Sequence, residues 1–325
     1  MAYGSPLFSL TGKRVWVAGH RGMVGGAIVR RLAGEGCEIL TVSRQEVDLR
    51  RQDEVERWML RERPEVVFLA AAKVGGILAN DTYPAEFLYD NLMIEANVIK
   101  TASDSGVERL LFLGSTCIYP KLAPQPIAEE ALLTGPLEPT NEWYAVAKIA
   151  GILQVQAIRR QHGLPFISAM PTNLYGPGDN FNLTTSHVMP ALIRKTHEAK
   201  LRGDRTLTIW GTGTPRREFL HVDDAADAMV FLMKHYSGIE HVNVGAGEDL
   251  TIRELAQKIM KVVGYEGEIV LDSSKPDGTP RKLVKMDKLF NLGWRPSLSL
   301  DEGLENAYRW YLCHAAAAES DKAHA

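Results

Sequence analysis

The chain has 325 residues, a formal net charge of −3, 45% hydrophobic residues and 24% charged residues. This length suits one large or two fused domains, and the charge gives no electrostatic reason to expect nucleic acid or an anionic membrane as a partner. The three cysteines, Cys37, Cys117 and Cys313, form no CxxC or Cys/His metal spacing, so we expect no metal site and a reducing compartment such as the cytoplasm.

The termini and the apolar runs predict no export signal and no membrane span. The first residues, MAYGSPLFSLTGKR, lack a basic segment followed by an apolar run. No apolar stretch reaches about 18 residues, the length that a spanning helix needs. The tail from Ala315 is interpreted as a frayed helix end or disorder.

Short apolar runs alternate with helical patterns across the first half of the chain. The runs predict strands at 14–18, 38–42, 66–70, 109–114 and 165–170, and helices are predicted at 28–36, 53–64, 84–103 and 142–161. Such alternation is typical of a parallel sheet covered on both faces. We therefore predict an α/β fold of the Rossmann type, with a doubly wound parallel sheet.

The regular alternation of strand and helix patterns ends after Tyr175. A helix at 185–199, strands at 206–210, 216–220 and 241–245, and a helix over 250–263 follow, the last opened by a capping box of Thr251 and Glu254. Asp224 is interpreted as a helix N-cap. We predict a Rossmann domain over 1–174 with a returning strand near 221–248, and a smaller α+β substrate domain made of 175–220 and 249–325.

A glycine-rich loop follows the first strand. Gly19, Gly22 and Gly25 form a G-x-x-G-x-x-G pattern between a strand and a helix. Glycines permit a tight turn and close approach of a phosphate, and the helix that begins there directs its N–H groups at a pyrophosphate. A purely structural turn is the alternative, but the strand before and the helix after favour dinucleotide binding.

The end of the second strand indicates which dinucleotide binds. An NAD-preferring loop usually places an acidic residue there, whereas this segment reads LTVSRQ, with Arg44 at the expected place and Glu46 just beyond it. Arg21 in the glycine loop is a second cation. Two guanidinium groups suit a 2′-phosphate, so we predict NADP(H) rather than NAD(H). The alternative is two solvated surface arginines.

Three segments follow strands three, four and five, where a sheet of this kind places its active site. They are AAAKVGG at 70–76, GSTCIYP at 114–120 and PTNLYGP at 171–177. The helix between the last two carries Tyr144 and Lys148, one turn apart on one face. The pair could be an ordinary surface contact, but beside a cofactor Lys148 would help Tyr144 to give or hold a proton.

These motifs carry a family resemblance. The glycine loop, Ser115, the Y-x-x-x-K pair and PTNLYGP resemble the extended short-chain dehydrogenase/reductases. AGHRGMVGGAI, LAAAKVGGI, FLGSTCIYPK, LEPTNEWYAVAKIAG, SHVMPALI, REFLHVDD and SKPDGTPRK are similar to the GDP-L-fucose synthase family, the GDP-4-keto-6-deoxy-mannose epimerase/reductases. The likeness runs from about residue 13 to 312.

The resemblance implies two reactions in one site: inversion at C3 and C5 of a keto sugar, then reduction of its C4 ketone by NADPH. Tyr144 would donate the proton, with Lys148 lowering its pKa, and Ser115 would hold the oxyanion. The resemblance assigns Cys117 and His187 the acid/base roles in epimerisation. Cys117 would face the same side as Ser115 if the chain is extended there. Without the resemblance, Cys117 reads as a packed core thiol and His187 as an uninformative histidine.

The resemblance also places the cofactor and the nucleotide sugar. We predict cofactor contacts, with Asp48 and Leu49 bordering the adenine, from Gly19, Arg21, Gly22, Met23, Val24, Gly25, Arg44, Asp48, Leu49, Ala71, Leu113, Gly114, Ser115, Thr116, Lys148, Pro171, Thr172, Asn173, Leu174 and His187. We predict contacts with the GDP-sugar from Asn173, Lys195, Trp210, Arg217, Asp277 and Lys282. Each could instead be a solvated surface residue.

Two other function classes stay open at this point. One is a nucleotide-sugar 4-epimerase or 4,6-dehydratase on the same fold, although dehydratases need an acid in the loop where this chain has Thr116 and Cys117. The other is a non-catalytic dinucleotide sensor, which the intact Ser115, Tyr144 and Lys148 disfavour. The resemblance further implies a homodimer joined through a four-helix bundle of helices 84–103 and 142–161.

Overall fold

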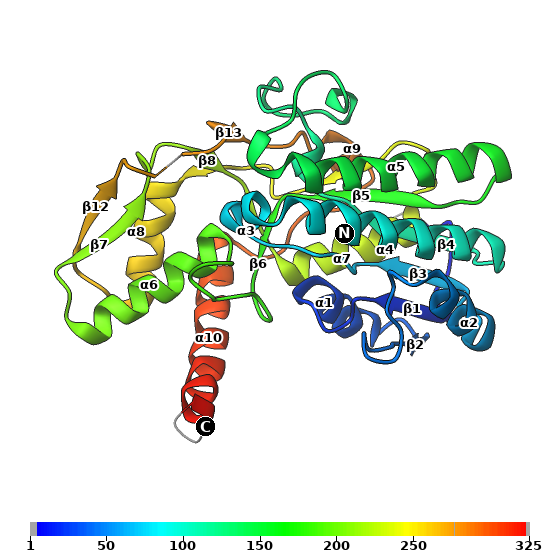
Figure 1. Cartoon of the computed structure of the whole chain (residues 1–325), viewed down its shortest axis with the longest axis horizontal. Coiled ribbons are helices and arrows are strands. Elements are labelled where there is room, and N and C mark those ends of the chain that lie inside the picture. The colour runs from blue at the N-terminus through cyan, green and yellow to red at the C-terminus, as the bar shows by residue number, and fades with distance from the viewer. Residues whose placement is uncertain (1–4, 276, 323–325) are drawn as a thin grey trace.

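The computed structural model describes residues 5–275 and 277–322 and is built around a six-stranded sheet (Figure 1). The strand order is β10-β5-β4-β3-β1-β2, and every pairing is parallel. These strands are β1 (Arg14–Ala18), β2 (Glu38–Leu40), β3 (Val66–Leu69), β4 (Arg109–Leu113), β5 (Ile167–Pro171) and β10 (Val242–Val244). The predicted parallel α/β sheet is confirmed.

The central strands are mostly apolar because helices cover both faces of the sheet. Every residue of β3 and β4 is buried. α4 (Pro84–Asp104) and α5 (Glu142–His162) pack against each other and α2 (Gln52–Glu62) packs against α4, while α1 (Met23–Leu32) packs against α7 (Val222–His235). The chain order reverses at β1, which lies between β2 and β3. The loops after β1 and β3 therefore lie next to each other at the carboxyl-terminal end of the sheet.

Smaller elements follow the sheet strand β5. Short sheets join β6 (Asn173–Tyr175) to β9 (Phe219–His221), β7 (Thr206–Trp210) to β12 (Glu268–Asp272), and β8 (Arg216–Arg217) to β11 (Leu250–Thr251) and β13 (Arg281–Lys282). The remaining helices are α3 (Ile77–Thr82), α6 (Val188–Arg202), α8 (Ile252–Val263), α9 (Asp287–Asn291) and α10 (Leu300–Lys322), with short 3₁₀ turns η1 (Thr116–Ile118), η2 (Glu129–Ala131) and η3 (Pro139–Asn141). α6, α8 and α10 surround a second hydrophobic core that includes Leu192, Leu255 and Leu304.

Several predicted elements differ from the structure. The strand predicted at 216–220 is two strands, because β8 and β9 join different sheets. The N-cap of α7 is His221, whose ring accepts a hydrogen bond from the Asp223 N–H, so the N-cap assignment of Asp224 was wrong. Asp224 instead accepts hydrogen bonds from Ser297 and the Leu298 N–H. The capping box of Thr251 and Glu254 is confirmed.

The division into two units stays a prediction, and one segment departs from it. Val284, Met286, Leu289 and Trp294 pack in the first core, although the predicted boundary assigns them to the second unit. The helix predicted to fray after Ala315 continues as α10 to Lys322, and residues 323–325 lie outside the described residues. Across the described part of the chain, none of the helices has the length and apolar character that crossing a membrane requires.

Candidate functional site

The glycine loop forms a tight turn against the loop that follows β3. Gly19 has φ +92°, and a Cβ on it would lie 2.7 Å from the Ala71 backbone. A Cβ on Gly25 would lie 2.1 Å from the Gly19 carbonyl oxygen, so α1 begins in contact with the turn. Gly22, the N-cap of α1, gives the helix no side-chain cap. The first-turn N–H groups of α1, at Met23 and Val24, are therefore positioned to hold a phosphate.

Two cationic side chains lie near this turn: Arg21 belongs to the glycine loop, and Arg44 follows the end of β2. Arg21 and Arg44 are both exposed, and among the described residues neither forms an ion pair. The carboxylate of Glu46 accepts hydrogen bonds from the Ser43 N–H and hydroxyl, at 3.0 and 2.7 Å. The Glu46 carboxylate is thus folded back on its own turn, which leaves the two guanidinium groups unpaired with it and available for a 2′-phosphate.

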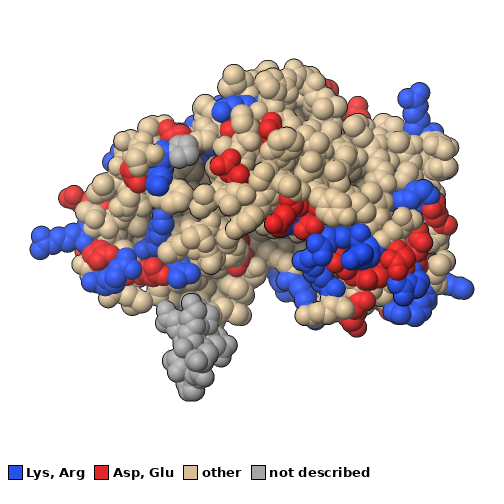
Figure 2. All heavy atoms as spheres, in the orientation of Figure 1, with Lys and Arg blue, Asp and Glu red and all other residues tan. Residues whose placement is uncertain are grey.

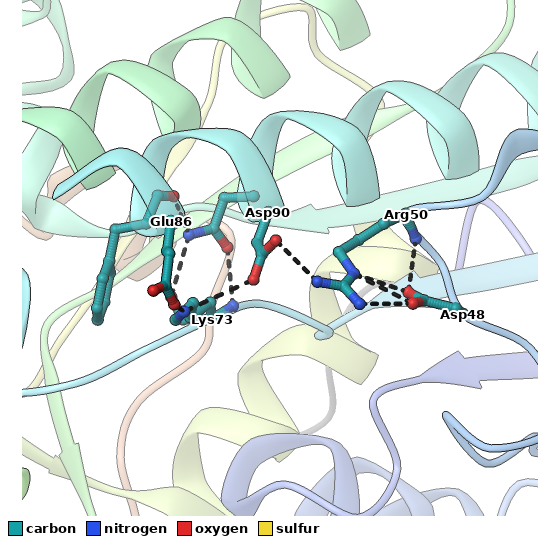
Figure 3. A network of polar contacts seen from close by, with 7 residues as sticks. Asp48, Arg50, Lys73, Glu86 and Asp90 are labelled. Carbon is teal, nitrogen blue, oxygen red and sulfur yellow. Dashed lines mark hydrogen bonds and ion pairs between the residues drawn. The ribbon is translucent and has the colours of Figure 1, made fainter. Parts of the chain in front are cut away.

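A polar network continues from this loop to α4 (Figure 3). Arg50 donates to Asp48 at 2.7 Å and to Asp90 of α4 at 3.0 Å, and Lys73 pairs with Glu86 and lies 3.7 Å from Asp90. Hydrogen bonds from Arg50 lower the pKa of Asp48 to about 2. The network connects the loop predicted to border the adenine to α4. The Asp48 carboxylate is hydrogen-bonded to Arg50 in this structure, and a contact of Asp48 with adenine stays a prediction.

The loop after β4 brings Ser115 and Cys117 together. The chain there is a 3₁₀ turn, η1, so the expectation of an extended segment was wrong. Ser115 is its N-cap, and its hydroxyl accepts a hydrogen bond from the Cys117 N–H at 3.2 Å. The same hydroxyl lies close enough to the phenol of Tyr144 to oppose the rise in its pKa. The turn therefore places a hydroxyl, a thiol and a phenol at one point.

Tyr144 and Lys148 lie on one face of α5, but the lysine is turned toward the interior. Burial raises the pKa of Tyr144 well above its usual range, and the charges of Cys117 and Glu95 add to the shift. The Lys148 ammonium lies 2.8 Å from the Glu95 carboxylate and donates to the Leu113 carbonyl oxygen at 3.1 Å. The Lys148 Nζ also lies 5.8 Å from the centroid of the Tyr144 ring. Burial dominates the pKa of Tyr144, so its lowering by Lys148 stays a prediction.

Cys117 has polar partners from two distant segments. Its Sγ lies 3.4 Å from the Lys282 Nζ and 3.4 Å from the Asn141 Nδ2. Burial alone would raise the pKa of the thiol, but the Lys282 ammonium and the Ser115 hydroxyl outweigh it, so the pKa is lowered. His187 is the exposed N-cap of α6, and the nearby Lys282 charge lowers its pKa. The predicted acid/base pair is therefore coupled through one ammonium group.

The predicted substrate residues form two groups. In the first, the Lys195 ammonium lies 4.8 Å from the ring centroid of Trp210, whose side chain is 49% exposed. Asp277 lies beside them, accepting hydrogen bonds from the Thr212 N–H at 2.7 Å and hydroxyl at 2.8 Å. An aromatic face next to a cation suits a base and a phosphate.

The second group lies closer to Cys117. Burial lowers the pKa of Arg217, and the nearby negative charges of Cys117 and Asp277 act in the opposite direction. The Asn173 amide donates to the Glu218 carbonyl oxygen at 2.8 Å. These residues continue the site from the thiol toward the Trp210 group.

The other predicted cofactor residues line the carboxyl ends of β4 and β5. Leu113 is buried at the end of β4, and the Gly114 N–H donates to the Ala169 carbonyl oxygen at 2.9 Å. The segment from Pro171 to Leu174 leads from β5 into β6, where the Thr172 N–H donates to the Val244 carbonyl oxygen at 2.9 Å. These loops lie at the carboxyl-terminal end of the sheet, the same end that carries the glycine turn.

Three roles were missed by sequence reasoning. Lys282 was predicted to contact substrate, not the Cys117 thiol, and Asn141 and Glu95 were not singled out. Asn141 lies three residues before Tyr144 in the NEWYAVAK stretch, and this short spacing could have indicated that Asn141 is near the site. Glu95 and Lys282 reach the site only through packing of distant segments, which no local pattern reveals.

The comparisons with known proteins agree with this geometry. Residues 15–245 match the NAD dependent epimerase/dehydratase family. A GDP-L-fucose synthase of Sinorhizobium fredii is 61% identical over 311 residues, which are 96% of this chain and 99% of that protein. A GDP-L-fucose synthase of Arabidopsis thaliana is 59% identical over 312 residues, covering 95% of this chain and 97% of that protein.

A solved structure shares the whole architecture. The GDP-L-fucose synthetase from Naegleria fowleri bound to NADP superposes with a TM-score of 0.87 at 28% identity, covering 96% of this chain and 98% of that chain. The chain belongs to the NAD-dependent epimerase/dehydratase family and, within it, to the GDP-L-fucose synthases.

Proposed function

We infer that this protein makes GDP-L-fucose from GDP-4-keto-6-deoxy-D-mannose, by epimerisation at C3 and C5 followed by NADPH-dependent reduction of the C4 ketone. The observation that carries this proposal is the meeting of Ser115, Cys117 and Tyr144 around η1, next to the glycine turn, in a chain 61% identical to a GDP-L-fucose synthase. One site thereby contains the groups for both reactions.

The reduction step needs a proton donor for the oxygen that gains charge. NADP(H), when bound along the glycine turn, supplies the hydride. Because the pKa of Tyr144 is raised, its phenol is protonated near neutral pH and can donate a proton to the developing alkoxide. The Ser115 hydroxyl, which lies close to that phenol, stabilises the same oxygen.

The epimerisation step needs a base and an acid on opposite faces of the sugar. A lowered thiol pKa raises the thiolate fraction of Cys117 at neutral pH, which suits proton abstraction next to the ketone. His187 then returns the proton. Only the imidazolium form can deliver a proton, so proton delivery should weaken as the pH rises through the lowered pKa of His187.

The GDP half of the substrate would lie along the second set of residues. Trp210 offers an exposed ring for guanine, and Lys195 and Arg217 offer cations for the diphosphate. Burial lowers the pKa of Lys195, so this position is more sensitive to high pH than a surface lysine. Asp277 orders the turn after β7 through Thr212 and thereby shapes the wall beside Trp210.

We also propose a cytoplasmic homodimer that pairs through α4 and α5. Trp143, Val146 and Leu153 recur at helical spacing on the outer face of α5, each 43–44% exposed, and Tyr89 of α4 is 60% exposed. Figure 2 shows that the surface over these two helices is largely uncharged. Two such helix pairs would form a four-helix bundle.

Product analysis with GDP-4-keto-6-deoxy-D-mannose and NADPH tests the proposed activity. We expect stoichiometric loss of the near-ultraviolet absorbance of NADPH and formation of GDP-L-fucose. A product formed without net NADPH loss would instead indicate a cofactor-recycling epimerase or dehydratase. NADPH binding without any product would indicate a sensor.

A further inference from the structure

A buried carboxylate faces Lys148 from the neighbouring helix. Glu95 of α4 is 1% exposed, and one of its oxygens lies 2.8 Å from the Lys148 Nζ of α5. The ammonium also donates to the Leu113 carbonyl oxygen and lies 4.7 Å from the Phe112 ring centroid. Among the described residues, Lys148 is the only charged group in contact with Glu95.

Burial of the Glu95 carboxylate carries a desolvation cost. Neither oxygen of Glu95 accepts a well-directed hydrogen bond from a described residue, so desolvation raises the pKa of Glu95 and the charge of Lys148 offsets that rise only in part. Gly151, one turn after Lys148, creates the space: a Cβ there would lie 2.8 Å from the other Glu95 oxygen and 2.5 Å from Phe112. Since well-packed apolar residues are often as stable as a buried ion pair, stability gives little reason for this arrangement.

We propose that Glu95 is a positioning residue for the reduction: its carboxylate holds the Lys148 ammonium between α4, α5 and the end of β4, beside Tyr144. This inference rests on the proposed reductase function. It adds to that function a residue that does not touch the substrate or the reacting atoms.

The electrostatic consequence has a definite sign. Titratable groups reach Tyr144 from two elements besides its own: Cys117 of η1 and Glu95 of α4. Reduction requires the protonated phenol. Removing the negative charge of Glu95 removes one cause of the raised Tyr144 pKa, so deprotonation of the phenol would end reduction at a lower pH. A carboxylate that only packed two helices would not move this limb of the pH profile.

The test compares the pH dependence of kcat for NADPH oxidation in matched variants. Glu95→Gln keeps the shape and removes the charge, and we expect the alkaline limb to shift to lower pH by about one unit, the usual spread of pKa values among sites in folded proteins, because Glu95 is a lesser cause of the raised Tyr144 pKa than burial. Glu95→Asp retains the charge and should keep the limb near its wild-type position while kcat falls. Glu129→Gln is the control, because Glu129 is also a buried glutamate but bonds the Asn243 N–H instead.

A second perturbation keeps the inference testable if Glu95→Gln does not fold. Gly151→Ala pushes the carboxylate away from the ammonium and should shift the alkaline limb in the same direction by a smaller amount. An unchanged limb in a folded Glu95→Gln or Gly151→Ala protein, or an equal shift in Glu95→Asp or Glu129→Gln, would overturn the proposal. Failure of the wild type to oxidise NADPH with the keto sugar would instead overturn the proposed function.

Discussion

Removing the cation beside the Cys117 thiol should slow epimerisation and move its pH dependence. The Lys282 Nζ lies 3.4 Å from the Sγ, where an ion pair has a Coulomb energy of about 5 kcal/mol at an effective dielectric constant of 20, as an upper limit. Desolvation of the thiolate opposes this gain, but the pKa of the thiol is lowered on balance. Lys282→Met should therefore leave roughly 10 to 1,000 times less thiolate near pH 7, the range expected for losing a close opposite charge.

Exchange of the C3 and C5 protons with deuterated solvent measures this step. Exchange requires the thiolate, so the rate rises with pH up to the thiol pKa; without Lys282 that rise should move to higher pH. Lys282→Arg should keep the rise near the wild-type position. Lys285→Met is the matched control, since Lys285 pairs with Asp287 on the same segment. Exchange that stays unchanged in Lys282→Met, or falls equally at every pH, would refute the reasoning.

Three further predictions follow from the site. Arg44→Ala should weaken NADPH by about tenfold or more and NADH little, because only NADPH carries the 2′-phosphate; equal weakening in a fluorescence titration would contradict the NADP assignment. Tyr144→Phe should lower NADPH oxidation by about 100-fold or more, the usual contribution of a positioned acid, while C3 and C5 exchange persists; loss of both together would place Tyr144 in epimerisation as well. Trp210→Ala should raise the KM for the GDP-sugar several-fold at nearly constant kcat, as expected for a stacking contact remote from the chemistry; a fall in kcat alone would remove guanine from this position.

Local patterns determined much of this protein from the sequence. The apolar runs of the first half gave the sheet strands because a strand buried on both faces must be apolar along its length. The capping box of Thr251 and Glu254 was readable because its two hydrogen bonds join residues three apart. The glycine turn and the shared face of Tyr144 and Lys148 follow equally from short spacings, which helix and turn geometry convert directly into positions.

Only the tertiary structure decided which charges meet. Lys282 reaches Cys117 across 165 residues, and Glu95 reaches Lys148 across the interface between α4 and α5. The segment 216–220 became two strands because its halves found partners in different sheets. Contacts of this kind depend on how whole elements pack, and the electrostatics of the site depend on those contacts, so the pKa of Tyr144 could not be predicted from its helix alone.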